Sequence, residues 1–391
     1  MQIPSQIEYM LRKLADNGYE AYLVGGCVRD FLLKKTPNDY DITTSALPEE
    51  TMAVFENDRV IPTGLKHGTV TVLYDGVSAE ITTYRTETTY SDNRHPDKVE
   101  FSKNISDDLR RRDFTVNAMA IGLDGKFVDL YGGESDLVHK TVRTVGEPKE
   151  RFSEDALRIL RAFRFASKLG FEIEKDTLDA AVYLAKRLVF VSRERIFEEF
   201  SKLLCGVQVG RVLQIMYEGR IFDSIFENPK INTDAFLYID TLPRREDIRF
   251  SALFIDDENI TEHAASLKTS KEFVYSVKRI SECALPRVQS KSLIRKLIYE
   301  SGKDAALARA LIEQKIELHD FVLRVIDEEN CFSLSDLDID GKEIMSLTGC
   351  QGKEVGALLN TLLFAVFDEK VRNSKVDLTE YLKKVDKTEK V

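Results

Sequence analysis

Two aspartates separated by a single residue, Asp39 and Asp41, have the spacing of a metal-binding pair. If residues 40–44 form a strand, its two-residue period places both carboxylates on one face and turns Tyr40 and Ile42 toward a core. Carboxylate oxygens are the ligands that hard cations such as Mg²⁺ prefer. The pair therefore predicts a site at which two carboxylates share divalent cations.

A glycine pair precedes the aspartates and indicates a place for phosphate. Gly25 and Gly26 follow an apolar run at 21–24 that is typical of a buried strand, and residues 27–33 have a helical pattern. Backbone N–H groups at the start of a helix bind anions. A glycine pair alone is weak evidence, because many tight turns use one and no G-x-G-x-x-G or Walker pattern is present. Combined with the carboxylates, it predicts a nucleoside triphosphate site.

Residues 22–45 resemble, nearly position by position, the first motif of a nucleotidyltransferase family. This family includes the bacterial class II tRNA nucleotidyltransferases, which are the CCA-adding enzymes, and the bacterial poly(A) polymerases. The resemblance is dense in motifs from about residue 3 to 205 and is thinner afterwards. It implies that Asp39 and Asp41 are catalytic and hold Mg²⁺. The nucleotide-binding positions that it implies in this segment are Gly25, Gly26 and Arg29.

A third carboxylate, Glu80, lies in the alternating segment 79–85, which predicts a strand. A strand of this kind can run beside the aspartate pair and complete a metal site. Taken alone, a glutamate on a strand is more often a solvated surface residue. The resemblance matches Glu80 to the family's third acidic position, and we therefore assign it a catalytic role.

The segment 110–118 resembles the family motif for ribose recognition. A 2′-hydroxyl offers one donor and one acceptor, so an arginine and an aspartate can distinguish ribose from deoxyribose. The alternative interpretation is a surface ion pair at the start of a helix. The resemblance implies nucleotide-binding roles for Arg112, Asp113 and Asn117, and we predict that Arg111 contacts RNA.

Asp155 and Arg158 resemble the family's base-reading motif. On one helix they are i,i+3 neighbours and can face one ligand together. The carboxylate accepts from the exocyclic amine of cytosine or adenine, and the guanidinium donates to the adjacent ring nitrogen. Uracil and guanine would leave buried groups unpaired, at about 1–3 kcal/mol each. The alternative is an ordinary helical salt bridge.

The predicted helix that begins near this motif has two contrasting stripes. Apolar residues fall on one side at helical spacing, and basic residues fall on another, where phosphate could meet them. A basic stripe is usually a solvated face, but this one begins at the proposed base reader. We predict that Arg161 and Arg164 bind nucleotide and that Lys168 binds RNA. The last family-like segment, 192–199, predicts a helix start with a structural role.

Composition is consistent with these motifs. The chain has 391 residues, of which 43% are hydrophobic, and a net charge of −10. This charge argues against a protein that coats nucleic acid, but local basic clusters can still hold one RNA. No apolar run approaches a membrane span, and five scattered cysteines show no disulfide framework, which predicts a cytoplasmic protein. The sequence does not indicate the oligomeric state.

The order of predicted elements defines an α+β fold. An amphipathic helix over Ile7, Met10, Leu11 and Leu14 comes first, and strands and short helices then alternate to about Asp129. Helical patterns dominate after Pro148. We predict an N-terminal nucleotidyltransferase head with a mixed β-sheet and helices, followed by an all-α neck, body and tail. The expected bounds are 1–139 for the catalytic head, 140–214 for the neck with base recognition, 215–325 for the body and 326–391 for a tRNA-binding tail.

The resemblance implies a template-independent enzyme that builds and repairs the CCA end of tRNA from CTP and ATP. The segment 63–69, which includes His67, resembles the tRNA enzymes and lacks the Arg-Arg-Phe-Arg-type stretch of poly(A) polymerases. CC-adding members characteristically lack a loop that looks intact here at 85–97. Full CCA addition is therefore favoured. The alternatives are an A-adding enzyme, a poly(A) polymerase and a non-catalytic RNA-binding protein.

Overall fold

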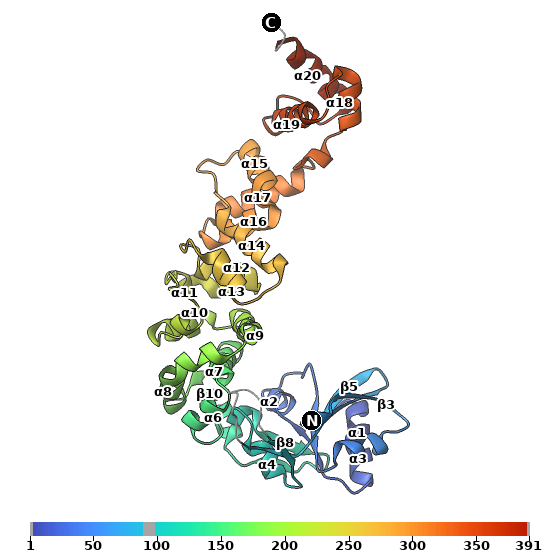
Figure 1. Ribbon diagram of the computed structural model, residues 1–391, viewed down its shortest axis with the longest axis vertical. Helices are drawn as coiled ribbons and strands as arrows, with labels where there is room; N and C mark the ends of the chain where they lie inside the picture. The colour runs from blue at the N-terminus through green and yellow to red at the C-terminus, as the bar shows by residue number, and fades with distance from the viewer. Residues whose placement is uncertain (1–2, 89–97, 389–391) are drawn as a thin grey trace. The chain divides into compact units, whose positions relative to one another are not determined.

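The chain forms two compact units, Met1–Pro229 and Lys230–Val391. The computed structural model describes residues 3–88 and 98–388 (Figure 1). The first unit contains a mixed sheet with helices around it, and the second consists of helices. The predicted α+β class, with its sheet confined to the N-terminal part, is confirmed. The finer division into head, neck, body and tail stays a prediction.

Within the described residues, the central sheet has seven strands in the order β3-β4-β5-β2-β1-β8-β9. The pair β2–β5 is parallel, and the other neighbours are antiparallel. Strand β2 is therefore flanked by β1 on one side and by β5 on the other. The seven strands are β1 (Ala21–Val24), β2 (Asp41–Thr44), β3 (Arg59–Gly64), β4 (Thr69–Tyr74), β5 (Val77–Thr83), β8 (Met119–Gly122) and β9 (Phe127–Asp129).

Short helices surround this sheet. The first helix buries Ile7, Met10, Leu11 and Leu14, the four residues that the sequence pattern predicted, and it contacts β1 and β5. The second helix starts directly after Gly25 and contacts β1 and β8. The helices of this part are α1 (Ser5–Asp16), α2 (Gly26–Leu32), α3 (Pro48–Val54), α4 (Ile105–Arg110) and α5 (Gly133–Val138).

Helices also form the rest of the first unit, where α7 packs on α9. The apolar stripe predicted for α7 is buried at Ile159, Ala162, Phe163 and Ala166. The predicted all-α neck is corrected at one point, because the β-branched residues of β10 (Thr141–Val142) and β11 (Glu172–Ile173) form a short parallel pair. The helices are α6 (Pro148–Glu154), α7 (Leu157–Leu169), α8 (Lys175–Leu184), α9 (Arg193–Leu204) and α10 (Val209–Glu218).

Within the described residues of the second unit, one hydrophobic cluster includes Ile298 and Val322, and another includes Leu362 and Phe367. No helix in the described ranges is long and apolar enough to cross a membrane. The helices of this unit are α11 (Ala235–Tyr238), α12 (Glu246–Leu253), α13 (Ile260–Ser266), α14 (Lys271–Glu282), α15 (Lys291–Ser301), α16 (Lys303–Ile312), α17 (Ile316–Glu328), α18 (Gly341–Thr348), α19 (Lys353–Phe367) and α20 (Lys375–Thr388).

Candidate active site

The carboxylates of the predicted site meet on two adjacent strands. Asp41 is the first residue of β2, and Glu80 lies directly opposite it on the parallel strand β5. Burial, together with the negative charges of Asp39 and Glu80, raises the pKa of Asp41 to about 6 against the opposing charge of Arg112. Asp39 and Glu80 therefore both lie close enough to repel the Asp41 carboxylate.

The strand is shorter than the sequence pattern predicted. It begins at Asp41 and not at Tyr40, so Asp39 lies in the segment that enters the strand. The reason is that β1 ends at Val24, opposite Asp41, and offers no partner to the residues before it. Tyr40 is only half-buried, with its ring 6.1 Å from that of Phe31, so its predicted place in the core is wrong. Ile42 is fully buried, as predicted.

The chemistry of these donors fits a divalent cation. A half-buried carboxylate whose pKa is raised by burial and by like charges is stabilised in its ionised form by a cation placed among the three groups. Across the residues that the structure describes, no three His, Cys, Asp or Glu side chains already converge as a metal cluster. The assignment of the metal to Asp39 and Asp41 therefore stays a prediction.

The glycine turn lies beside Asp41. Gly25 precedes α2 with a φ of 77°, a conformation that L side chains rarely adopt. A Cβ atom at Gly25 would lie 3.0 Å from Nη1 of Arg112 and 3.9 Å from Oδ2 of Asp41. At Gly26 it would lie 3.6 Å from Nη2 of Arg29. Glycine thus brings the backbone close to a guanidinium and to a carboxylate of the predicted site.

A buried aspartate that the sequence analysis missed holds two of the predicted arginines. Asp108 accepts from Nε and Nη2 of Arg111 at 3.0 and 2.6 Å, and from Nη2 of Arg112 at 3.0 Å. Burial acts to raise the pKa of Asp108, but Arg111 and Arg112 lower it overall. Its i,i+3 and i,i+4 spacing to the two arginines was the available signal.

Arg112 and Asp113 do not form a pair with each other, because each has a different partner. Asp113 accepts from Nε of Arg161 on α7 at 2.8 Å and caps the backbone N–H of Phe114 at 2.8 Å. Burial would raise the pKa of Asp113, but Arg161 outweighs it and lowers the pKa to about 2. The surface ion pair considered as the alternative is wrong, since the Asp113 side chain is 10% exposed.

Two further predicted residues, Arg29 and Asn117, contact each other. Arg29 donates from Nη1 to Oδ1 of Asn117 at 2.7 Å and from Nε to Asp30 at 2.9 Å. Arg29 and Asn117 are both buried. This contact joins α2, which follows the glycine turn, to the segment predicted to read ribose.

The predicted base reader has a different local structure from the one expected. Asp155 is not on the helix with Arg158, because α6 ends at Glu154 and Asp155 has extended backbone before α7 begins. Its Oδ1 accepts from the backbone N–H of Leu157 at 3.0 Å, a bond with which aspartate competes against helix formation. The i,i+3 arrangement is therefore wrong, although Asp155 and Arg158 still flank one helix start.

Each member of this predicted pair has a partner of its own. Asp155 accepts from Nη2 of Arg195 on α9 at 2.7 Å. Arg158 donates from Nη1 to Oε2 of Glu154 at 2.5 Å and is 9% exposed. The simple i,i+3 salt bridge that was the alternative does not form. Arg195 belongs to the segment that sequence analysis assigned to structure alone.

The basic stripe of α7 is only partly open to solvent. Glu199 of α9, which is 5% exposed, lies 2.6 Å from Nε of Arg164 and 3.6 Å from Nη1 of Arg161. Lys168, farther along the helix, is exposed. The arginines are therefore held in an ion-pair network, whereas Lys168 faces solvent as an RNA contact would require.

A cavity of about 180 Å³ opens between the carboxylates and the arginines. It contains three residues, Thr69, Thr82 and Arg85, that the sequence analysis did not assign. Its full lining is Val24, Asp41, Ile42, Thr69, Glu80, Thr82, Arg85, Arg111 and Arg112.

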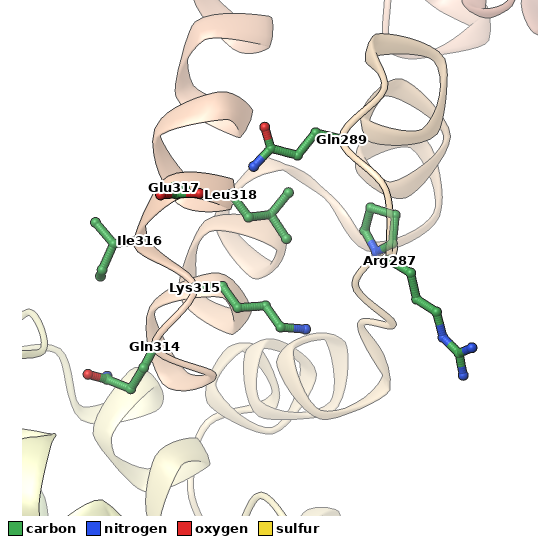
Figure 2. A pocket seen from close by; sticks show the side chains of 8 residues that line it. Arg287, Gln289, Gln314, Lys315, Ile316, Glu317 and Leu318 are labelled. Atoms are coloured by element: carbon green, nitrogen blue, oxygen red, sulfur yellow. The ribbon is translucent and has the colours of Figure 1, made fainter.

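The second unit contains a larger recess, of about 460 Å³, at the start of α17 (Figure 2). Gln289 and Lys315 approach it from its two sides, and the Nζ atom of Lys315 is 2.6 Å from Glu313. None of the predicted site residues lines this recess.

The loop at 85–97, on which the prediction of full CCA addition depends, is described only at its base. Strands β6 (Arg85–Thr88) and β7 (Lys98–Phe101) pair there, and residues 89–97 lie outside the described residues. The segment that contains His67 forms part of β3 and a short 3₁₀ turn, Leu65–His67. An intact loop at 85–97 therefore stays a prediction.

Comparisons with known proteins extend over most of the chain. A family model described as "Poly A polymerase head domain" matches residues 21–143. Models described as "Probable RNA and SrmB- binding site of polymerase A" and "tRNA nucleotidyltransferase domain 2 putative" match residues 170–233 and 250–382.

Relatives that match this chain over nearly their whole length are CCA-adding enzymes. The CCA-adding enzyme of Bacillus subtilis is 37% identical over 96% of both chains, and that of Lactobacillus helveticus is 36% identical over 96% of both. The crystal structure of the Bacillus stearothermophilus CCA-adding enzyme in complex with CTP matches with a TM-score of 0.86 at 29% identity, covering 100% of this chain and 99% of that chain.

The fold and these matches define a nucleotidyltransferase. Both relatives are more than 35% identical to this chain over 96% of its length. The chain belongs to the family of CCA-adding enzymes.

Proposed function

We propose that this chain adds and repairs the 3′-terminal CCA of tRNA, using CTP and ATP without a nucleic-acid template. The observation that carries this function is the pairing of Asp41 with Glu80 beside the Gly25 turn. It provides a negative centre, formed by a half-buried aspartate and an exposed glutamate, next to a backbone turn that can receive phosphate. The full-length similarity to CCA-adding enzymes supports the choice of tRNA as substrate.

The triphosphate is expected to lie at Gly25 and Gly26, with Arg112 neutralising its charge. Arg112 is oriented by Asp108, which leaves the guanidinium close to both Gly25 and Asp41. Asp113 and Asn117 are expected to contact the ribose. Arg161 and Arg29 fix these two side chains, so the sugar would meet groups that are already oriented.

Base selection is assigned to Asp155 and Arg158. Arg195 orients the Asp155 carboxylate, and Glu154 holds the guanidinium of Arg158. The carboxylate then accepts from an exocyclic amine while the guanidinium donates to a ring nitrogen, a pattern that cytosine and adenine share. A pocket of this kind uses protein side chains where a polymerase would use a template strand.

Mg²⁺ is the cation that we propose for the carboxylates, with Asp39 and Asp41 as ligands and Glu80 in support. When bound, it would lower the pKa of the RNA 3′-hydroxyl and neutralise the departing pyrophosphate. The nucleophile belongs to the RNA. The chain's own residues bind and orient the two substrates so that the hydroxyl reaches the α-phosphorus.

Nucleotide incorporation tests this function directly. Three tRNA transcripts, ending before CCA, after the first C and after CC, are offered CTP and ATP separately and together with Mg²⁺. Completion of all three is expected. Extension of the CC-ended transcript alone, by one A, would instead identify an A-adding enzyme, and long ATP-only tails on unstructured RNA would identify a poly(A) polymerase. Binding of CTP or tRNA without turnover would indicate a non-catalytic protein.

A further inference from the structure

The small cavity beside the carboxylates is lined by Arg112, which lies next to the glycine turn, and also by Thr69 of β4 and Thr82 of β5. Strand β2 carries Asp41 at its start, β1 leads into Gly25 on one side of β2, and β5 carries Glu80 on the other. Thr82 follows Glu80 by two residues on β5 and lines the same cavity. The Asp41–Glu80 pair therefore stands between Gly25 and the end of the cavity formed by Thr82.

In nucleotidyl transfer the attacking and leaving oxygens lie on opposite sides of the phosphorus, roughly in line. If the pyrophosphate lies toward Gly25, the attacking hydroxyl must arrive from the opposite side of the carboxylates. That side is the end of the cavity formed by Thr69, Thr82 and Arg85, which we call the acceptor end. This geometric requirement assigns the acceptor end to the RNA and not to the incoming nucleotide.

The side chains at the acceptor end suit a ribose and a phosphate. Thr69 and Thr82 are opposite each other on β4 and β5, and their hydroxyl oxygens are 3.0 Å apart. Arg85 supplies a positive charge. The whole cavity, at about 180 Å³, is smaller than the roughly 300 Å³ at which sites for complete small molecules begin. It has room for one sugar with its phosphate.

Arg85 is held in place by its surroundings. Its Nη1 donates to the backbone carbonyl of His67, and Arg85 lies opposite Phe101 in the β6–β7 pair. Gly68, at a φ of 77°, lets the Phe101 ring approach, because a Cβ there would lie 2.7 Å from Cε1 of that ring. One side of the guanidinium is thus anchored on the turn at His67 while the side chain borders the cavity.

We propose that the acceptor end binds the last nucleotide of the tRNA, with the Arg85 guanidinium on the phosphodiester that joins the final two nucleotides. The threonine hydroxyls hydrogen-bond the terminal ribose. This inference rests on the proposed function. In the transfer, the RNA 3′-oxygen bonds to the α-phosphorus and the bond from that phosphorus to pyrophosphate breaks. The electron pair leaves with pyrophosphate, and the hydroxyl proton passes to solvent.

Steady-state kinetics of Arg85→Gln on CC-ended tRNA with ATP tests the assignment. Loss of one charge-assisted contact should raise KM for tRNA about tenfold and leave KM for ATP unchanged. The slope of log KM against log salt should fall by about 0.7, the value for one single-strand phosphate. Arg59→Gln, an exposed arginine on the edge strand β3, is the control and should change neither constant.

A modified substrate identifies the phosphate. The test substrate is a tRNA with an uncharged methylphosphonate in place of the phosphodiester between its last two nucleotides. It should raise KM for tRNA by the same factor in the wild-type enzyme, and it should raise the KM of Arg85→Gln no further. An equal further loss in the variant, or a rise in KM for ATP with KM for tRNA unchanged, would overturn the assignment. A wild-type enzyme that extends no tRNA would instead refute the proposed function.

A second variant keeps the proposal testable if Arg85→Gln does not fold. Thr82→Val keeps the shape of the side chain and removes one hydroxyl from the cavity. Wild type should extend tRNA with a 2′-deoxy terminal nucleotide less efficiently than normal tRNA, and Thr82→Val should lose most of that difference. A variant that keeps the full difference, with an unchanged melting temperature, would contradict the ribose contact.

Discussion

Asp41 and Glu80 are direct neighbours across the only parallel strand pair of the described central sheet. Parallel pairing sets the two side chains side by side, so neither strand can shift its register without separating them. The sheet thus stabilises an arrangement of like charges that is unfavourable by itself. Such strain is expected at a site that is completed by a cation.

The first prediction is that Asp41→Asn stabilises the metal-free protein while abolishing nucleotide incorporation. The pKa of Asp41 is raised to about 6 from an ordinary value of 3.8, so the wild type loses stability as the pH rises from about 4 to about 6, and above this range the ionised carboxylate destabilises the fold by about 1–3 kcal/mol. Below about pH 4 the carboxyl is protonated in both the folded and unfolded states, and the difference should vanish. Urea unfolding of both proteins between about pH 3.5 and 8 measures this trend.

Added Mg²⁺ provides the control for that measurement. It should raise the melting temperature of the wild type at pH 8 and raise that of Asp41→Asn much less, because the variant has lost a ligand. Equal stabilisation of both proteins would contradict the assigned site. Activity of the wild type should fall as the pH drops through about 6, since the cation needs the ionised carboxylate.

A second prediction separates backbone strain from catalytic position at Gly25. A residue held in a sparsely populated backbone region costs about 1–3 kcal/mol, and alanine should be unfavourable in this way at both Gly25, with a φ of 77°, and Gly18, with a φ of 87°. Only at Gly25 would the new Cβ meet Arg112, at 3.0 Å, whereas nothing lies within 4 Å at Gly18. Gly25→Ala should therefore lose on the order of a hundredfold in kcat/KM.

The matched variant Gly18→Ala should lose stability to a similar degree and keep its activity. Thermal melting, and incorporation of CTP into the tRNA transcript that ends before CCA, would be measured for both variants. If Gly25→Ala is as active as Gly18→Ala, the glycine turn does not position Arg112 against the substrate.

The parts of the fold that depend on local periodicity were predictable. The buried side of α1, the strand that leads into Gly25 and the strand that carries Glu80 all follow from spacing along the chain. The start of β2 could not be predicted from spacing, since it depends on where β1 ends and not on the sequence of residues 38–41. A strand ends where its partner strand ends, and the periodicity of one segment gives no information about that partner.

The choice of ionic partners was also hidden in the sequence. Asp155 separates α6 from α7, because its side chain accepts from the backbone N–H of Leu157. Its carboxylate also pairs with Arg195, forty positions away. Arg161 similarly meets Asp113 and not a residue on its own helix. Helical spacing predicts neighbours on one helix, but pairs between elements require the packing of α7 on α9. The glutamates and arginines of 192–199 therefore looked structural.

A third prediction concerns base selection by Arg158. Arg158→Ala should increase incorporation of UTP and GTP relative to CTP and ATP more than it weakens triphosphate binding, because it removes the donor to the ring nitrogen. Arg151→Ala is the control, since Arg151 contacts the same Glu154 carboxylate at 2.6 Å but is not expected to meet the base. Competition assays with all four nucleotides would be measured. Unchanged selectivity in Arg158→Ala would refute the assigned role.

The last prediction concerns the ion pair between Asp113 and Arg161, which joins the ribose segment to α7. Asp113→Asn removes the charge that lowers the cost of burying Arg161, and Glu199, at 3.6 Å, compensates only in part. Breaking a fully buried pair by removing one partner costs about 3–5 kcal/mol, and because the Arg161 side chain is 32% exposed we expect a smaller loss, of about 1–3 kcal/mol. The exposed pair of Glu8 and Arg12 at 2.6 Å is the comparison, where Glu8→Gln should cost less than about 1 kcal/mol.

Kinetics distinguishes a purely structural pair from one that orients the substrate. At a temperature where Asp113→Asn remains folded, its KM for CTP and ATP should still rise, because the ribose contact is lost with the charge. The double variant Asp113→Asn with Arg161→Gln should be more stable than the sum of the single effects predicts, since the uncompensated guanidinium is removed. Additive losses in the double variant would show that the two side chains act independently, and the link from α7 to the ribose segment would then not hold.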